Sequence, residues 1–124
     1  MKKIKTKKLH FQASKSSGNV SAVLMTPEEA KYVLVLAHGA GAGMNHPFME
    51  MLSVKLVEKN FAVFRYQFPY FEKGRRSPDP LNILTATVRS AIETASNKLM
   101  LGLEKFLSCR IPVFSQTLAS KIFL

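Results

Sequence analysis

Apolar and polar positions along the chain first divide it into two extended segments joined by a turn. Residues 3–13 alternate loosely between lysines or other polar residues and the apolar side chains Ile4, Leu9 and Phe11, a pattern typical of an exposed strand. Residues 14–19, which include Gly18, predict a turn. Residues 19–25 (NVSAVLM) predict a second short strand. The two segments together predict a hairpin.

The next three segments have a different pattern. Residues 31–37 form a continuous β-branched and leucine run, which is expected of a strand covered on both faces. Residues 61–66 (FAVFRY) predict a second buried strand. Between them, the sequence from Pro47 has helical spacing, with an apolar stripe of Phe48, Met51, Leu52, Leu56 and Val57.

A long helix is predicted to begin near residues 79–81 and to continue to about Lys98, with Asp79 as its N-cap and Pro80 at the first helical position. Strand, helix, strand and helix in this order favour a parallel sheet with right-handed crossovers. The fold class is therefore α/β, with a hairpin followed by a parallel β-α-β-α unit.

The pattern weakens towards the C-terminus. We assign residues 1–98 to one half-domain and residues 99–124 to a divergent segment. Within that segment, residues 99–107 are compatible with an extension of the helix and residues 111–114 with a third parallel strand.

Composition narrows the function classes. Of the 124 residues, 47% are hydrophobic, which is typical of a globular core, and the longest apolar run, residues 32–37, is too short to span a membrane. The single Cys109 cannot form an internal disulfide, so we expect a reducing cytoplasm. The net charge of +10 invites a nucleic-acid hypothesis. The lysines gather instead at positions 2–8, which favours a protected edge strand over a DNA-binding surface.

The most informative motif is AHGAGAGMNHP, residues 37–47, between a predicted strand and a predicted helix. A dinucleotide fingerprint G-x-G-x-x-G fails here, because Met44 or His46 stands where the third glycine is needed. A P-loop fails as well, since no Gly-Lys-Ser/Thr precedes the helix. An oxyanion loop that opens with His-Gly is the best match, because its glycines let amide N–H groups point at a developing oxyanion. The alternative is a glycine loop that only turns the chain.

Three phrases then resemble one family. The runs VLAHGAGAGMNHPFM, FAVFRYQFPYFEKGRRSPDP and VRSAIETA look like the dienelactone-hydrolase-like branch of the α/β-hydrolases. That branch includes bacterial predicted hydrolases, a testis-expressed protein and a histone-acetyltransferase-complex subunit. The resemblance covers roughly residues 20–97. It implies a serine hydrolase acting on small-molecule ester-like or acyl bonds without a cofactor. It also implies an oxyanion loop formed by His38, Gly39, Ala40, Gly41 and Ala42.

The family pattern stops before the nucleophile. The family continues with a short strand, which residues 111–114 match, and then with a glycine-flanked serine. Residues 115–121 contain no glycine, and the position of the family's serine holds Ala119. Ser115 and Ser120 lack the glycine-flanked elbow. We therefore expect a truncated protein that lacks nucleophile, acid and histidine and is inactive alone, and we assign no catalytic residue.

The histidines support this expectation, because all of them precede the nucleophile position, whereas the family's catalytic histidine follows it. They also show no zinc-ligand spacing, and no metal is predicted. We interpret His38 as a residue that shapes the loop and His46 as a helix-entry residue. The candidates for a pocket lining or an anion contact are Asn45, His46, Arg75 and Arg76, although a solvated or locally paired loop is the alternative for both arginines.

Two other functions remain open at this point. The scaffold could serve as a non-catalytic protein-interaction module, or the basic chain could bind nucleic acid. An exposed sheet edge also predicts self-association.

Overall fold

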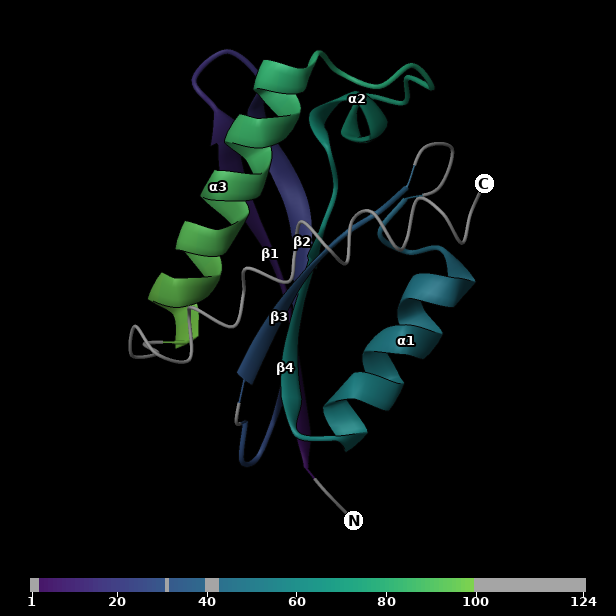
Figure 1. Cartoon of the computed structure of the whole chain (residues 1–124), viewed down its shortest axis with the longest axis vertical. Coiled ribbons are helices and arrows are strands. Elements are labelled where there is room, and N and C mark those ends of the chain that lie inside the picture. Colours follow the sequence, from purple (N-terminus) through teal and green to yellow (C-terminus); the bar gives the residue numbers. More distant parts are fainter. Residues whose placement is uncertain (1–2, 31, 40–42, 100–124) are drawn as a thin grey trace.

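The computed structural model describes residues 3–30, 32–39 and 43–99, which form a four-stranded sheet between helices (Figure 1). Strand β1 (Ile4–Ser14) pairs antiparallel with β2 (Gly18–Pro27), and Gly18 adopts φ +80° where the chain turns between them. The predicted hairpin is confirmed, with β1 shifted by one residue from the prediction and β2 longer than predicted. Lys5, Lys7 and Lys8 are exposed on β1, at one end of the strand order, as expected for a protected edge.

The two buried apolar runs form the parallel part of the sheet. Strand β3 (Tyr32–Ala37) pairs parallel with β4 (Phe61–Tyr66), and β4 also pairs antiparallel with β2. The strand order is therefore β1-β2-β4-β3, with β4 in the interior. The α/β fold class is confirmed, as a mixed sheet.

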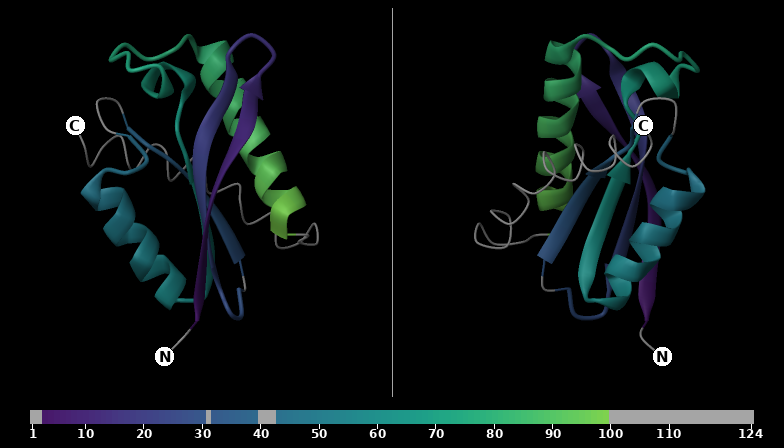
Figure 2. Two further views of the ribbon diagram at one scale, coloured as in Figure 1. Left: turned by 180° about the vertical axis from the view of Figure 1, so that it is seen from behind. Right: turned by 45° about the vertical axis from the view of Figure 1, so that its right-hand side comes forward.

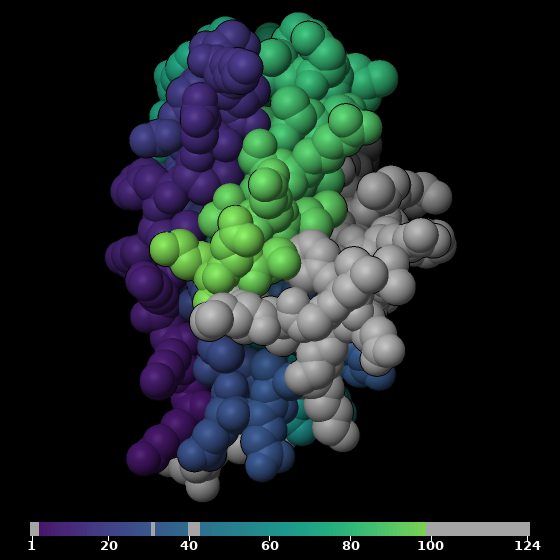
Figure 3. All heavy atoms as spheres, turned by 90° about the vertical axis from the view of Figure 1, so that its left-hand side faces the viewer, coloured from purple at the N-terminus to yellow at the C-terminus, as the bar shows by residue number. Residues whose placement is uncertain are grey.

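Helices cover opposite faces of this sheet (Figure 2). Helix α3 (Leu81–Leu99) packs on a core that contains Phe64, Tyr66, Ala91 and Ala95. Figure 3 shows α3 lying along β1. Helix α1 (Pro47–Glu58) packs on a second core that contains Val63, Leu34 and Met49. None of the helices in the described ranges is long and apolar enough to cross a membrane.

The apolar stripe predicted for α1 is confirmed at Val57, which is buried, and at Leu52 and Leu56, which pack against this core, and it is wrong at Met51. The buried positions are Met49, Ser53 and Val57, whereas Met51 is 50% exposed. Ser53 can occupy the inner face because its hydroxyl donates a hydrogen bond to the Met49 carbonyl at 2.7 Å. A hydroxyl satisfied within its own helix can be buried at little cost, and hydrophobic spacing alone does not reveal this.

A short helix, α2 (Pro69–Glu72), lies in the loop after β4 and was not predicted. Helix α3 begins at Leu81, and its first hydrogen bonds are accepted by the Pro80 carbonyl. The prediction that residues 99–107 extend this helix and that residues 111–114 form a strand concerns positions outside the described residues.

Candidate functional site

The candidate site lies where the two parallel strands end. Ala37 and Tyr66 are register partners at the last positions of β3 and β4, so the segments that follow them leave the sheet at the same edge. In open α/β sheets, ligands bind outside the carboxyl ends of the strands. The segment after β3 begins the glycine motif with His38 and Gly39, and the segment after β4 leads into α2.

His38 connects these two segments. Its Nδ1 lies 3.0 Å from the Gly39 carbonyl, and its Nε2 accepts a hydrogen bond from the Phe68 backbone amide at 3.0 Å. Because Nε2 accepts from an amide, Nδ1 carries the proton and donates to Gly39. The ring is 2% exposed and packs at 5.1 Å between ring centroids from Phe68 and at 5.2 Å from Phe71. These contacts hold the start of the glycine motif against the chain that follows β4.

The other end of the glycine motif is held by the same segment. The Gln67 side chain accepts a hydrogen bond from the Met44 backbone amide at 2.8 Å. At Gly43, an added Cβ would lie 2.5 Å from Phe71 Cε1 and 3.0 Å from Gln67 Oε1. Only a glycine therefore lets the backbone approach this closely. Ala40, Gly41 and Ala42 lie between the two anchored ends and outside the described residues.

Helix α2 is itself fixed to its surroundings by two acidic residues. The Glu72 carboxylate accepts hydrogen bonds from the Ser21 amide at 3.1 Å and from the Ser21 hydroxyl at 2.8 Å. The Asp79 carboxylate accepts from the Tyr70 amide at 2.8 Å. This amide lies in the first turn of α2, where the N-cap residue Phe68 has no side-chain cap. Asp79 therefore caps α2 from the far end of the following loop.

The position of Asp79 also affects the pKa of Tyr70. Burial raises the pKa of Tyr70 above its ordinary value, and the negative charge of Asp79 raises it further. The phenol therefore stays neutral over a wider pH range than a free tyrosine does.

The structure separates the residues that the sequence grouped as pocket candidates. His46 is the N-cap of α1, and its Nδ1 accepts from the Phe48 amide at 3.1 Å, which agrees with the helix-entry interpretation. Arg75 and Arg76 are exposed and line a cavity of about 370 Å³ beside Phe71. Asn45 is exposed and lines a different cavity.

Sequence reasoning missed Gln67, Glu72 and the role of Asp79. Gln67 follows a buried strand directly, the place where parallel strands present ligand-binding groups, and this position was the available signal. The Asp79 contact reaches back over nine residues and has no local signature. Among the described residues, no cluster of histidine, cysteine, aspartate or glutamate could hold a metal ion.

The family described as the alpha/beta hydrolase domain matches residues 30–111, more than half of the chain. No curated protein matches the sequence.

Solved structures share the fold at low identity. A serine hydrolase without a lid from Xanthomonas campestris has a TM-score of 0.59 at 15% identity, and the match covers 75% of this chain and 45% of that protein. A dienelactone hydrolase from Anabaena variabilis has 0.58 at 14%, with 73% and 45% covered. A cold-adapted esterase from an Arctic intertidal metagenomic library has 0.55 at 14%, with 77% and 44% covered. The match thus spans less than half the length of each of these proteins.

Proposed function

This chain belongs to the alpha/beta hydrolase domain family, and from that premise we propose that it supplies the oxyanion side of a serine-hydrolase site for ester-like or related acyl bonds. The observation that carries the proposal is the double anchoring of the glycine motif. His38 holds one end of this segment and Gln67 holds the other. The segment that carries the amides is therefore fixed at both ends.

Stabilisation of an oxyanion requires amide donors that are held in a fixed orientation. Donors that are already oriented do not reorganise during the reaction, and removing a single such donor typically lowers the rate by roughly 10²–10³-fold. In this fold one of the donors comes from the loop after the third strand, which corresponds to the segment from His38 to Gly43. The ester substrate class rests on the relatives, which include an esterase and a dienelactone hydrolase.

We further propose that this chain alone does not complete the reaction. The sequence contains no G-x-S-x-G elbow. Both ring nitrogens of His38 hydrogen-bond to the backbone, which suits a structural role better than that of a general base. Several serine hydroxyls are likewise committed to structural acceptors: Ser21 to Glu72, Ser53 to Met49, and Ser90 to Ala13. The lone cysteine supports a cytoplasmic location.

The absence of catalysis is tested with the purified 124-residue chain. We expect no labelling by a fluorophosphonate probe, and we expect hydrolysis of p-nitrophenyl butyrate at the rate of a Ser115→Ala/Ser120→Ala double variant. Labelling of either serine, or hydrolysis that disappears in the double variant, would show that the chain is catalytically complete.

The oxyanion role is tested separately by ¹⁵N NMR titration with methylphosphonate, a tetrahedral anion. Saturable shifts should be confined to amides of residues 38–44. Gln67→Ala should weaken them because it frees the Met44 amide. The control Gln12→Ala should not, since Gln12 is exposed on β1 and its side chain hydrogen-bonds to the Ser14 carbonyl, away from the glycine motif. Unchanged spectra in this segment would refute the oxyanion role.

A further inference from the structure

A second site is indicated by a charged side chain in the interior of the sheet. Arg65 lies on the central strand β4, faces α1 and is only 7% exposed. Arginine is rarely buried to this extent unless it is paired. Its Nη1 lies 3.5 Å from the Met25 sulfur, a weak acceptor. Its Nε is the only buried side-chain nitrogen or oxygen in the described ranges without a hydrogen-bond partner.

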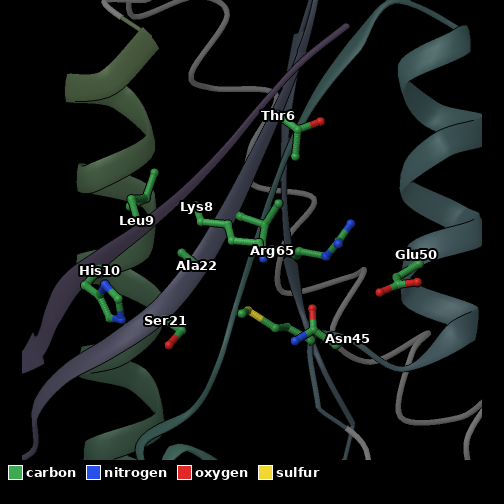
Figure 4. A pocket seen from close by; sticks show the side chains of 11 residues that line it. Thr6, Lys8, Leu9, His10, Ser21, Ala22, Asn45, Glu50 and Arg65 are labelled. Carbon is green, nitrogen blue, oxygen red and sulfur yellow. The ribbon is translucent and has the colours of Figure 1, made fainter.

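The guanidinium therefore carries a desolvation cost that the weak contact with Met25 only partly offsets. Burial lowers the pKa of Arg65, and the charge of Glu50 opposes this change. Glu50 is exposed on the first turn of α1, and Figure 4 shows it pointing towards Arg65 across an opening. A buried polar group left unpaired requires an explanation, and an unseen ligand or ion is one of the recognised ones.

A cavity of about 540 Å³ adjoins Arg65. Its size is within the usual range of small-molecule pockets, which combine apolar walls with a few polar groups. Val23 and Met44 supply apolar surface. The polar groups come from β1, β2, β4, α1 and the residues before α1, and Lys8 extends into the cavity from β1 (Figure 4).

The charges around the cavity specify the kind of ligand. Lys8 and Arg65 are positive and Glu50 is negative, which leaves one net positive charge. A monoanion neutralises that charge, whereas a dianion would place a second negative charge near Glu50. A planar carboxylate also matches the donor geometry of a guanidinium edge.

We propose that this cavity binds a small organic monocarboxylate, with its carboxylate between Arg65 and Lys8 and its short apolar part against Val23 and Met44. The site lies on the α1 face of β1, β2 and β4, so the proposal does not depend on the oxyanion loop. Asn45, which the sequence grouped with the hydrolase pocket, contributes an amide to this cavity instead.

The experiment is a ¹⁵N NMR titration of the full chain with butyrate, with neutral butyramide as the matched ligand control. Butyrate should shift amides of Thr6, Lys8, Asn45 and Glu50 saturably with millimolar affinity, the range expected of so small a ligand. Butyramide should bind roughly tenfold more weakly or not at all, because it lacks the charge-assisted hydrogen bond.

Three variants and a control test the assignment. Arg65→Met should weaken butyrate binding by at least roughly tenfold. Lys8→Met, at an exposed position where the fold is not at risk, should weaken it several-fold. Glu50→Gln should tighten it, because a like charge is removed. Arg89→Met, an exposed arginine on α3 at the opposite face, should leave binding unchanged.

Several outcomes would overturn the proposal. These are no saturation with butyrate, equal binding of butyramide, inorganic phosphate binding more tightly than butyrate, or full affinity in Lys8→Met. Weaker binding in Glu50→Gln would likewise contradict the proposal, because removing a like charge beside the carboxylate must not cost affinity. Of residues 38–43, those that the structure describes do not line this cavity, and Thr6, Lys8 and Glu50 do not belong to the glycine motif. Shifts at these two sets of amides therefore distinguish failure at one site from failure at the other.

Discussion

Gly43→Ala tests the contact that holds the end of the glycine motif. The added methyl carbon would lie 2.5 Å from Phe71 Cε1 and 3.0 Å from Phe71 Cδ1. Carbon atoms in contact prefer roughly 3.5–4.0 Å, so the ring or the backbone must shift by about 1 Å. The ring cannot move freely, because it packs 5.2 Å from His38 and 6.2 Å from Tyr70, measured between ring centroids.

Two opposing effects determine how much Gly43→Ala changes the free energy of unfolding. Inserting a methyl group into a packed contact typically costs about 1–3 kcal/mol. Gly43 is not among the glycines with positive φ, so alanine fits the backbone and stabilises by about 0.4–1 kcal/mol through the unfolded state. The steric cost is the larger of the two. Gly43→Ala should therefore lower the free energy of unfolding by about 1–2 kcal/mol.

The assay is urea unfolding followed by far-UV circular dichroism, since the chain has no tryptophan. A double-mutant cycle with Phe71→Ala isolates the contact. In the Phe71→Ala background, Gly43→Ala should cost less than in the parent, because the clashing ring is gone. Gly18→Ala provides the control: its φ of +80° strains alanine, but nothing lies within 4 Å, so it should be additive with Phe71→Ala. An additive Gly43/Phe71 cycle, or a stabilised Gly43→Ala, would refute the reasoning.

Three further predictions concern charges and buried polar groups. Asp79→Ala should destabilise by about 1 kcal/mol through loss of the α2 cap, and Asp79→Asn should retain most of that stability. Both should lower the pKa of Tyr70, as read by NMR titration of its ring, and an unchanged pKa would contradict the charge effect. Burial raises the pKa of Tyr66 above its ordinary value of 10.0, so its contribution to stability is complete below about pH 10 and is lost as pH rises above that value. Tyr66→Phe should make the alkaline decline in urea midpoint shallower, and an equally steep decline would contradict this assignment. Arg65→Met should raise the free energy of unfolding by about 1 kcal/mol because an unpaired buried donor disappears, and a loss in urea unfolding would show that Arg65 is satisfied within the fold.

Much of the fold followed from local pattern. Alternation in residues 3–13 and the uninterrupted apolar run in residues 31–37 indicated strands of two kinds, and these became the edge strand β1 and the parallel strand β3. The burial of Ser53 and the exposure of Met51 on α1 did not follow from the pattern, because the Ser53 hydroxyl is satisfied within its own helix and a methionine tolerates exposure. Apolar spacing measures residue type, whereas burial depends on where the helix meets the sheet.

For the candidate site, the sequence predicted the start of the glycine motif but not the residues that hold it. The His-Gly turn after a buried strand pointed to residues 38–39 at the carboxyl end of the sheet. The groups that hold the motif were missed, because Gln67 and Asp79 act through contacts that span many residues. Arg65 was missed for a related reason: within FAVFRY it was counted as part of a buried strand, and an arginine in a buried strand needs a partner that local pattern cannot supply.

The contacts around α2 explain how the site could keep its shape in a chain that matches less than half of each solved relative. The hydrogen bonds that fix the ends of the glycine motif join residues 38–44 to residues 67–68, and α2 is tied in turn to Ser21 and Asp79. Both partners of each bond lie within the described residues. The ends of the motif can therefore be held without any contribution from the part of the relatives that the match does not cover. The amides of Phe68 and Met44 should therefore be among the slowest to exchange with solvent in the isolated chain.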